Sequence, residues 1–135
     1  MPYVIFSIDN VSDTHTLAKF TRHIDTQSAM QKMRGIMVHC IGYWEGTLEP
    51  SFIMTLQDFT DHVKPFGFVD NQICVIECMQ SLHPRGKDSQ RPCYLVYPDG
   101  RRETIGSMME ISAADAMRLD AWTYRMDLGK YFAAK

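Results

Sequence analysis

The sequence predicts an α+β fold with a split-βαβ, or ferredoxin-like, β-α-β-β-α-β core and a C-terminal β extension. The chain has 135 residues, of which 45% are hydrophobic, so residues 1–135 are expected to form a single domain with one core. Apolar, β-branched runs alternate with two amphipathic segments in the order that this core requires. More short apolar runs follow toward the C-terminus, and these predict the extension.

Local residue patterns predict each element of the core. Ser12 and Asp13 suit the start of a first helix, and Thr55 with Asp58 suits the start of a second helix that ends near Pro65. A turn at Trp44-Glu45-Gly46 is short enough to join two strands as a hairpin. The four core strands are predicted at Tyr3–Ile8, Ile36–Tyr43, Thr47–Met54 and Ile73–Met79.

The C-terminal extension is predicted to be mostly β. Pro98-Asp99-Gly100 marks a turn, and Ser112 suits the cap of a short helix through Leu119. Strands are predicted at Tyr94–Tyr97, Glu103–Ile105, Trp122–Met126 and Tyr131–Ala134. The helices would cover one face of the sheet, so the extension or another subunit must cover the other face. We therefore expect a closed cyclic oligomer.

Charge, hydropathy and cysteine usage exclude several classes of protein. Fourteen Lys and Arg against sixteen Asp and Glu give a net charge of −2, which argues against a nucleic-acid binder. No stretch is long and apolar enough for a membrane span, and the first residues do not resemble a signal peptide. The four cysteines and five histidines lack the spacing of metal sites. We expect a cytoplasmic protein with reduced thiols, no metal and no cofactor.

The segment Gly42–Phe52 is the densest candidate site. Its two glycines let the backbone approach a ligand closely, its aromatic rings attract cations, and its two glutamates carry negative charge. Such a set suits a small organic cation with a flat ring. The alternative is a plain hairpin with solvated glutamates. The candidate residues are Gly42, Tyr43, Trp44, Glu45, Gly46 and Glu49.

Glu110 is a second candidate, because it stands among the apolar residues Ile105, Met108, Met109 and Ile111. A carboxylate in apolar surroundings can have a shifted pKa or can anchor a ligand. The alternative is a side chain that simply points into solvent.

These residues together resemble the bacteriophage S-adenosylmethionine-degrading enzymes, which were formerly called hydrolases and are now regarded as lyases. Gly42 and Tyr43 take the place of a Gly-Cys-Tyr-like strand end, and Glu49 that of the glutamate that opens the next strand. The stretch 106–111 is similar to a family Gly-x-x-Gln-Glu-Val stretch, with Met109 at the position of the Gln and Glu110 at that of the Glu. The tail from Trp122 to Tyr131 resembles the family's aromatic-threonine hairpin, so the resemblance covers most of the chain from Gly42 on.

The resemblance implies a homotrimer with a ferredoxin-like or PII-like core and active sites between subunits. It implies conversion of S-adenosylmethionine to methylthioadenosine and homoserine lactone, in which the substrate's own carboxylate displaces the sulfonium. Glu49 would hold the amino group or balance the sulfonium, and Tyr43 would face the cationic centre. Glu110 would contact the substrate from a neighbouring subunit, and the remaining substrate-binding residues would be Met109, Trp44 and Gly42.

The biological role that the resemblance implies is depletion of S-adenosylmethionine in the host cytoplasm, which counters restriction. A host methionine adenosyltransferase is a further partner that some members of the family bind. A hydrolase would instead use Glu49 as a general base on water. Two other functions stay open: a PII-like trimer that binds a nucleotide-like ligand without turnover, and an inhibitor of a host protein that acts through its Met-rich surface.

Overall fold

The computed structural model describes residues 2–7, 37–64 and 75–135. The first helix, expected from Ser12 and Asp13, lies outside the described residues, and so does the end of the second helix near Pro65. The described strands are β1 (Tyr3–Ser7), β2 (Met37–Trp44), β3 (Thr47–Thr55), β4 (Val75–Cys78), β5 (Cys93–Val96), β6 (Arg102–Gly106), β7 (Met108–Ile111), β8 (Ala121–Arg125) and β9 (Lys130–Ala134). The described helices are α2 (Leu56–Asp58), η1 (Phe59–Val63), η4 (Gly86–Gln90) and α3 (Ala113–Ala116).

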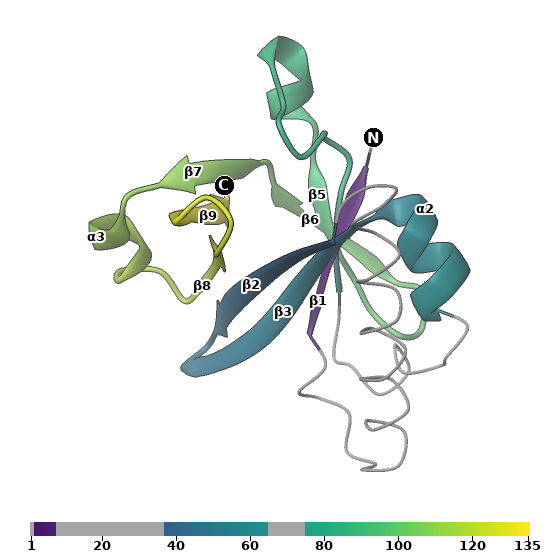
Figure 1. Cartoon of the computed structure of the whole chain (residues 1–135), viewed down its shortest axis with the longest axis horizontal. Coiled ribbons are helices and arrows are strands. Elements are labelled where there is room, and N and C mark those ends of the chain that lie inside the picture. Colours follow the sequence, from purple (N-terminus) through teal and green to yellow (C-terminus); the bar gives the residue numbers. More distant parts are fainter. Residues whose placement is uncertain (1, 8–36, 65–74) are drawn as a thin grey trace.

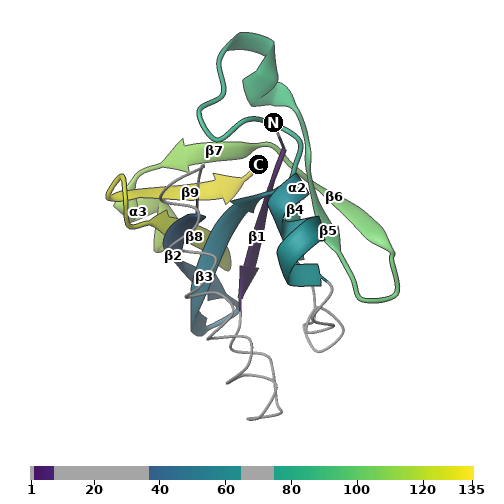
Figure 2. The same cartoon turned by 45° about the vertical axis from the view of Figure 1, so that its right-hand side comes forward.

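The described strands form one antiparallel sheet in the order β6-β5-β4-β1-β3-β2-β8-β9-β7 (Figure 1). Only Ser107 separates β6 from β7, yet these two strands lie at opposite ends of that order. Ser107 and Lys135 exchange two backbone hydrogen bonds, of 2.9 and 3.0 Å, beside this junction. The two ends of the sheet are therefore joined by the chain itself, and the sheet curls into a nearly closed barrel (Figure 2).

The prediction of an α+β, ferredoxin-like or PII-like fold with a C-terminal extension is wrong. The described residues are mostly antiparallel strands of one barrel-like sheet, and their helices are short, such as the three residues of α2 and the four of α3. The physical reason is the pairing of β8 with β2, in which residues 121–125 bond along residues 40–44. The expected extension thus continues the sheet instead of covering its face. Local residue patterns carry no information about such a long-range pairing.

Several local predictions are confirmed. The Thr55 hydroxyl accepts a hydrogen bond of 3.1 Å from the Asp58 backbone N–H at the start of α2, and Ser112 caps α3 in the same way. Glu45 and Gly46 have φ angles of 45° and 94°, the pattern of a two-residue type I′ turn between β2 and β3. The strand β7 was not predicted, because a four-residue run gives a weak pattern.

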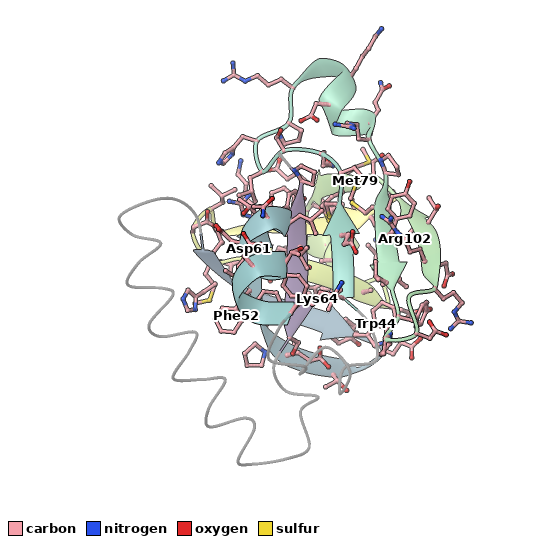
Figure 3. The ribbon with its side chains drawn as sticks, turned by 90° about the vertical axis from the view of Figure 1, so that its right-hand side faces the viewer. Trp44, Phe52, Asp61, Lys64, Met79 and Arg102 are labelled. Carbon is pink, nitrogen blue, oxygen red and sulfur yellow. The ribbon has the colours of Figure 1, made fainter. Side chains whose placement is uncertain are left out.

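Strand β1 is buried on both faces, which explains its uninterrupted apolar sequence. The ring of Phe6 packs against Phe52 and against Phe59 of η1, at centroid distances of 5.7 and 5.2 Å, so the short helical segment covers the outside of β1 and β3 there. Figure 3 shows Phe52 beside this segment and Trp44 on the other side of the ribbon. Inside the barrel a second cluster comprises Tyr3, Ile5, Val38, Cys40, Ile53, Cys78, Cys93 and Met108. Among the described residues no helix is long and apolar enough to span a membrane.

Candidate functional site

A recess of about 80 Å³ opens where β1, β2 and β3 come together with β8. Four of the predicted site residues line it: Gly42, Tyr43, Trp44 and Glu49. Small polar residues and apolar residues complete the wall, most of them from strands outside the hairpin. These are Ser7, Ser51, Thr123, Ile5, Phe6, Ile76 and Leu95. The structure therefore brings the predicted hairpin residues together in a cavity, which a solvated hairpin would not do.

The β2–β3 hairpin sets the positions of Gly42 and Glu49. The type I′ turn fixes the register, so that Gly42 lies directly opposite Glu49. A Cβ atom on Gly42 would come within 2.9 Å of the Ser51 Oγ, so the absence of a side chain keeps this wall of the recess open. The Ser51 hydroxyl donates a 3.2 Å hydrogen bond to the backbone carbonyl of Glu49.

The carboxylate of Glu49 is half-buried, and none of the basic side chains in the described part of the chain forms an ion pair with it. Glu45, at the turn of the same hairpin, is exposed and lies outside the recess. An acidic group at the edge of an apolar cavity is an attractive position for a cation, because screening by water is reduced there. The two glutamates of the hairpin therefore occupy different environments.

Tyr43, Trp122 and Tyr131 form a row of contacting rings on neighbouring strands, which we call the aromatic ladder. The ring of Tyr43 stacks on Trp122 of β8, with centroids 5.3 Å apart and planes inclined by 12°. Trp122 in turn meets the edge of Tyr131 on β9, at 5.0 Å. Stacked and edge-on rings restrict the rotation of each other's side chains. The ladder thus fixes the direction of Tyr43 at the rim of the recess.

Glu110 and Met109 lie outside the recess within one chain. Both are on β7, where Met109 is 49% exposed and the Glu110 carboxylate forms a 2.8 Å ion pair with Lys130 of β9. The side chains of Glu110 and Lys130 are 54% and 56% exposed, so this is a surface ion pair of little energetic weight. A single chain therefore does not bring Glu110 together with Glu49.

Sequence reasoning missed seven residues of the recess, and all of them except Ser51 lie beyond the hairpin. One signal was available for Ser51, because residues two apart on a strand share a face and Glu49 was already a candidate. Thr123 lies opposite Gly42 on the β8 side, a relationship that depends on the long-range pairing of β2 with β8. Ile5, Ile76 and Leu95 are neighbours across β1, β4 and β5, and no local pattern connects them with the hairpin.

Buried thiols lie in the barrel interior. Cys78 and Cys93 face each other on β4 and β5, with their sulfur atoms 2.9 Å apart, and both are fully buried free thiols. Burial raises the pKa of Cys78 far above its usual range, and burial raises the pKa of Cys40 to about 12. The thiols of Cys40 and Cys78 are therefore protonated at neutral pH and are poor nucleophiles. In the part of the chain that the structure describes, no three His, Cys, Asp or Glu side chains are grouped so that they could hold a metal ion.

The described residues form a nearly closed β-barrel with a recess lined by acidic and aromatic residues. No protein-family model matches the chain, and no curated protein matches it.

Proposed function

We propose that this protein degrades S-adenosylmethionine to methylthioadenosine and homoserine lactone by intramolecular displacement, as an S-adenosylmethionine lyase. One observation carries the proposal: Glu49 is half-buried, forms no ion pair with a basic side chain of the described residues, and shares a recess with Gly42, Tyr43 and Trp44. S-adenosylmethionine offers this site an ammonium group, a sulfonium and a flat adenine ring. Carboxylates and aromatic faces are the groups that attract such cations in proteins.

The reaction needs no nucleophile from the protein. The substrate carboxylate oxygen attacks Cγ, the Cγ–S bond breaks, and its electron pair stays on sulfur as the neutral thioether while the five-membered lactone closes. No proton moves in this step. The protein has to hold the carboxylate in line behind Cγ and to keep water away from that carbon. Buried Cys78 and Cys93 therefore need no catalytic role.

Charge changes during the displacement decide the role of Glu49. The positive charge on sulfur disappears as the bond breaks, so a carboxylate beside the sulfonium would stabilise the ground state more than the transition state. The ammonium group keeps its charge throughout. We therefore assign Glu49 to the ammonium group, where it directs the substrate carboxylate toward Cγ. Tyr43 and Trp44 bound the space and exclude water.

The size of the recess supports a contribution from a second subunit. Its volume of about 80 Å³ is below the ~300–1,000 Å³ of pockets that enclose drug-sized ligands. Most of the substrate would extend beyond the recess of one chain. In the homotrimer that we propose, Glu110 of a neighbouring subunit would meet that exposed part. Depletion of the S-adenosylmethionine of a host cell would then be the biological role.

The test is to incubate the purified protein with S-adenosylmethionine and to identify the products by chromatography. Methylthioadenosine with homoserine lactone is expected. Homoserine instead of the lactone would indicate a hydrolase, and binding without products would indicate a sensor of nucleotide-like ligands. If S-adenosylmethionine neither binds nor reacts, the proposal is wrong.

A matched pair of glutamates tests the site itself. Glu49→Gln should lower kcat/KM about 100-fold, because a charge-assisted contact of about 2–3 kcal/mol is lost. Glu45→Gln removes the same charge from the exposed turn of the same hairpin and should change kcat/KM less than about twofold. Equal effects of the two substitutions would contradict the assignment of Glu49.

A further inference from the structure

A second recess, of about 180 Å³, lies in the barrel interior next to the candidate site. The walls of the two recesses have four residues in common, which are Trp44, Ile76, Leu95 and Thr123. Most of the second wall is apolar and comes from strands at both ends of the sheet order, so barrel closure creates it. Its principal lining residues are Trp44, Trp122, Phe132, Ile105, Met108 and Ala134.

The wall of this recess carries no charged side chain. Thr123, which is only 6% exposed, supplies a polar side chain to this otherwise apolar wall. A charged ligand would lose its hydration here without an opposite charge to compensate. A neutral ligand with one hydroxyl or ring N–H would bury its apolar surface and form a hydrogen bond with the Thr123 hydroxyl.

The size and the walls of the recess favour a flat ring. Apolar cavities of ~150 Å³ in proteins bind benzene, and this recess is slightly larger. Trp44 and Phe132, which lie on the same sheet face as Thr123, offer aromatic surfaces that favour stacked or edge-on contacts with another ring. We propose that the barrel interior binds a small neutral aromatic molecule, with one ring or a fused pair and a single polar group.

The test of this site does not depend on the proposed lyase activity, because neither its ligand nor its readout involves S-adenosylmethionine. The two tryptophans of the chain both line the recess. Tryptophan fluorescence of the full chain therefore reports directly on occupancy of this recess.

The test titrates the protein with four probes that share a methyl-substituted ring. These probes are p-cresol, toluene, 4-methylbenzoate and 4-methylbenzylamine. Saturable binding is expected for p-cresol and toluene, with p-cresol about two- to tenfold tighter through one hydrogen bond. The anionic and cationic probes should bind at least about tenfold more weakly than p-cresol. Equal binding of all four probes, or no saturable binding of any, would overturn the proposal.

Two substitutions locate the bound probe. Ala134 is paired with Met108 across β9 and β7, and both residues line the recess. Ala134→Leu should therefore fill the recess and abolish binding. Ala114→Leu, on the exposed side of α3, adds the same volume elsewhere and should bind p-cresol like the wild type. Circular dichroism checks that both variants fold. Binding of p-cresol by a folded Ala134→Leu variant at wild-type affinity would refute this location.

Thr123→Val keeps the shape of the side chain and removes its hydroxyl. This variant tests the location of the bound probe even if Ala134→Leu does not fold. The substitution should remove the preference for p-cresol over toluene, so that the ratio of their affinities falls to about one. A ratio that stays at the wild-type value would show that Thr123 does not contact the ligand, and the proposed site would be wrong.

Discussion

Gly42 of β2 lies directly opposite Glu49 of β3, and on its other side it lies opposite Thr123 of β8. Because Gly42 has no side chain, space is left between Glu49 and Thr123 in the middle of the sheet. Glycine is normally unfavourable in such a position because it adds no packing. Its presence here keeps the candidate site open.

Gly42→Ala should lower kcat/KM of the proposed lyase reaction by about tenfold or more. The new methyl group would come within 2.9 Å of the Ser51 Oγ, and Ser51 is only 5% exposed and has little freedom to move. The recess would therefore narrow next to Glu49. Steady-state kinetics with S-adenosylmethionine measure the effect.

The double variant Gly42→Ala/Ser51→Ala is the control for this steric explanation. It removes the oxygen atom that the new methyl group would meet, so part of the activity should return. If the double variant is no more active than Gly42→Ala, the loss does not come from this contact.

Glu110→Gln should leave stability nearly unchanged, within about 0.5 kcal/mol, because its ion pair with Lys130 is exposed. Lys130→Gln breaks the same ion pair and serves as the matched control. If Glu110 contacts the substrate, Glu110→Gln should lower kcat/KM and Lys130→Gln should not. Thermal unfolding and kinetics of both variants separate the two effects, and an equal loss of activity in both would point to the ion pair instead.

Gly106→Ala should destabilise the fold by about 3 kcal/mol or more. Gly106 has a φ of 102° at the junction of β6 and β7, and a Cβ there would run into the backbone of Lys135. Gly46→Ala, at the exposed turn, has a φ of 94° but meets no atom, so it should cost only about 1 kcal/mol. Urea denaturation compares the two variants. Similar losses would mean that contact with the C-terminal end does not stabilise the barrel.

Stability should fall as the pH rises from 9 to 12. Burial raises the pKa of Cys40 from 9.0 to about 12, so the thiol stays protonated in the folded protein while the unfolded chain ionises near pH 9. Ionisation then favours the unfolded chain, by about 1.4 kcal/mol per pH unit for each such thiol. Cys40→Ala should show a shallower decline in the free energy of unfolding over this range. An unchanged slope would show that Cys40 titrates normally in the folded protein.

The sequence itself determined most of the local structure in the described residues. The alternation and β-branching of short runs located eight of the nine described strands, within one or two residues at most ends. Thr55, Ser112 and the Glu45-Gly46 turn were recognisable because caps and tight turns depend on neighbouring residues alone. The hairpin residues of the recess were recognisable for the same reason.

Only the tertiary structure decided how the strands combine. A strand of four or five residues carries no information about a partner eighty residues away, and the β2–β8 pairing therefore could not be predicted from local patterns. That pairing makes the C-terminal strands part of the barrel, positions Thr123 beside Gly42 and separates Glu110 from Glu49. Local propensity fixed the elements, and burial of their apolar faces in a common interior fixed the barrel and its recesses.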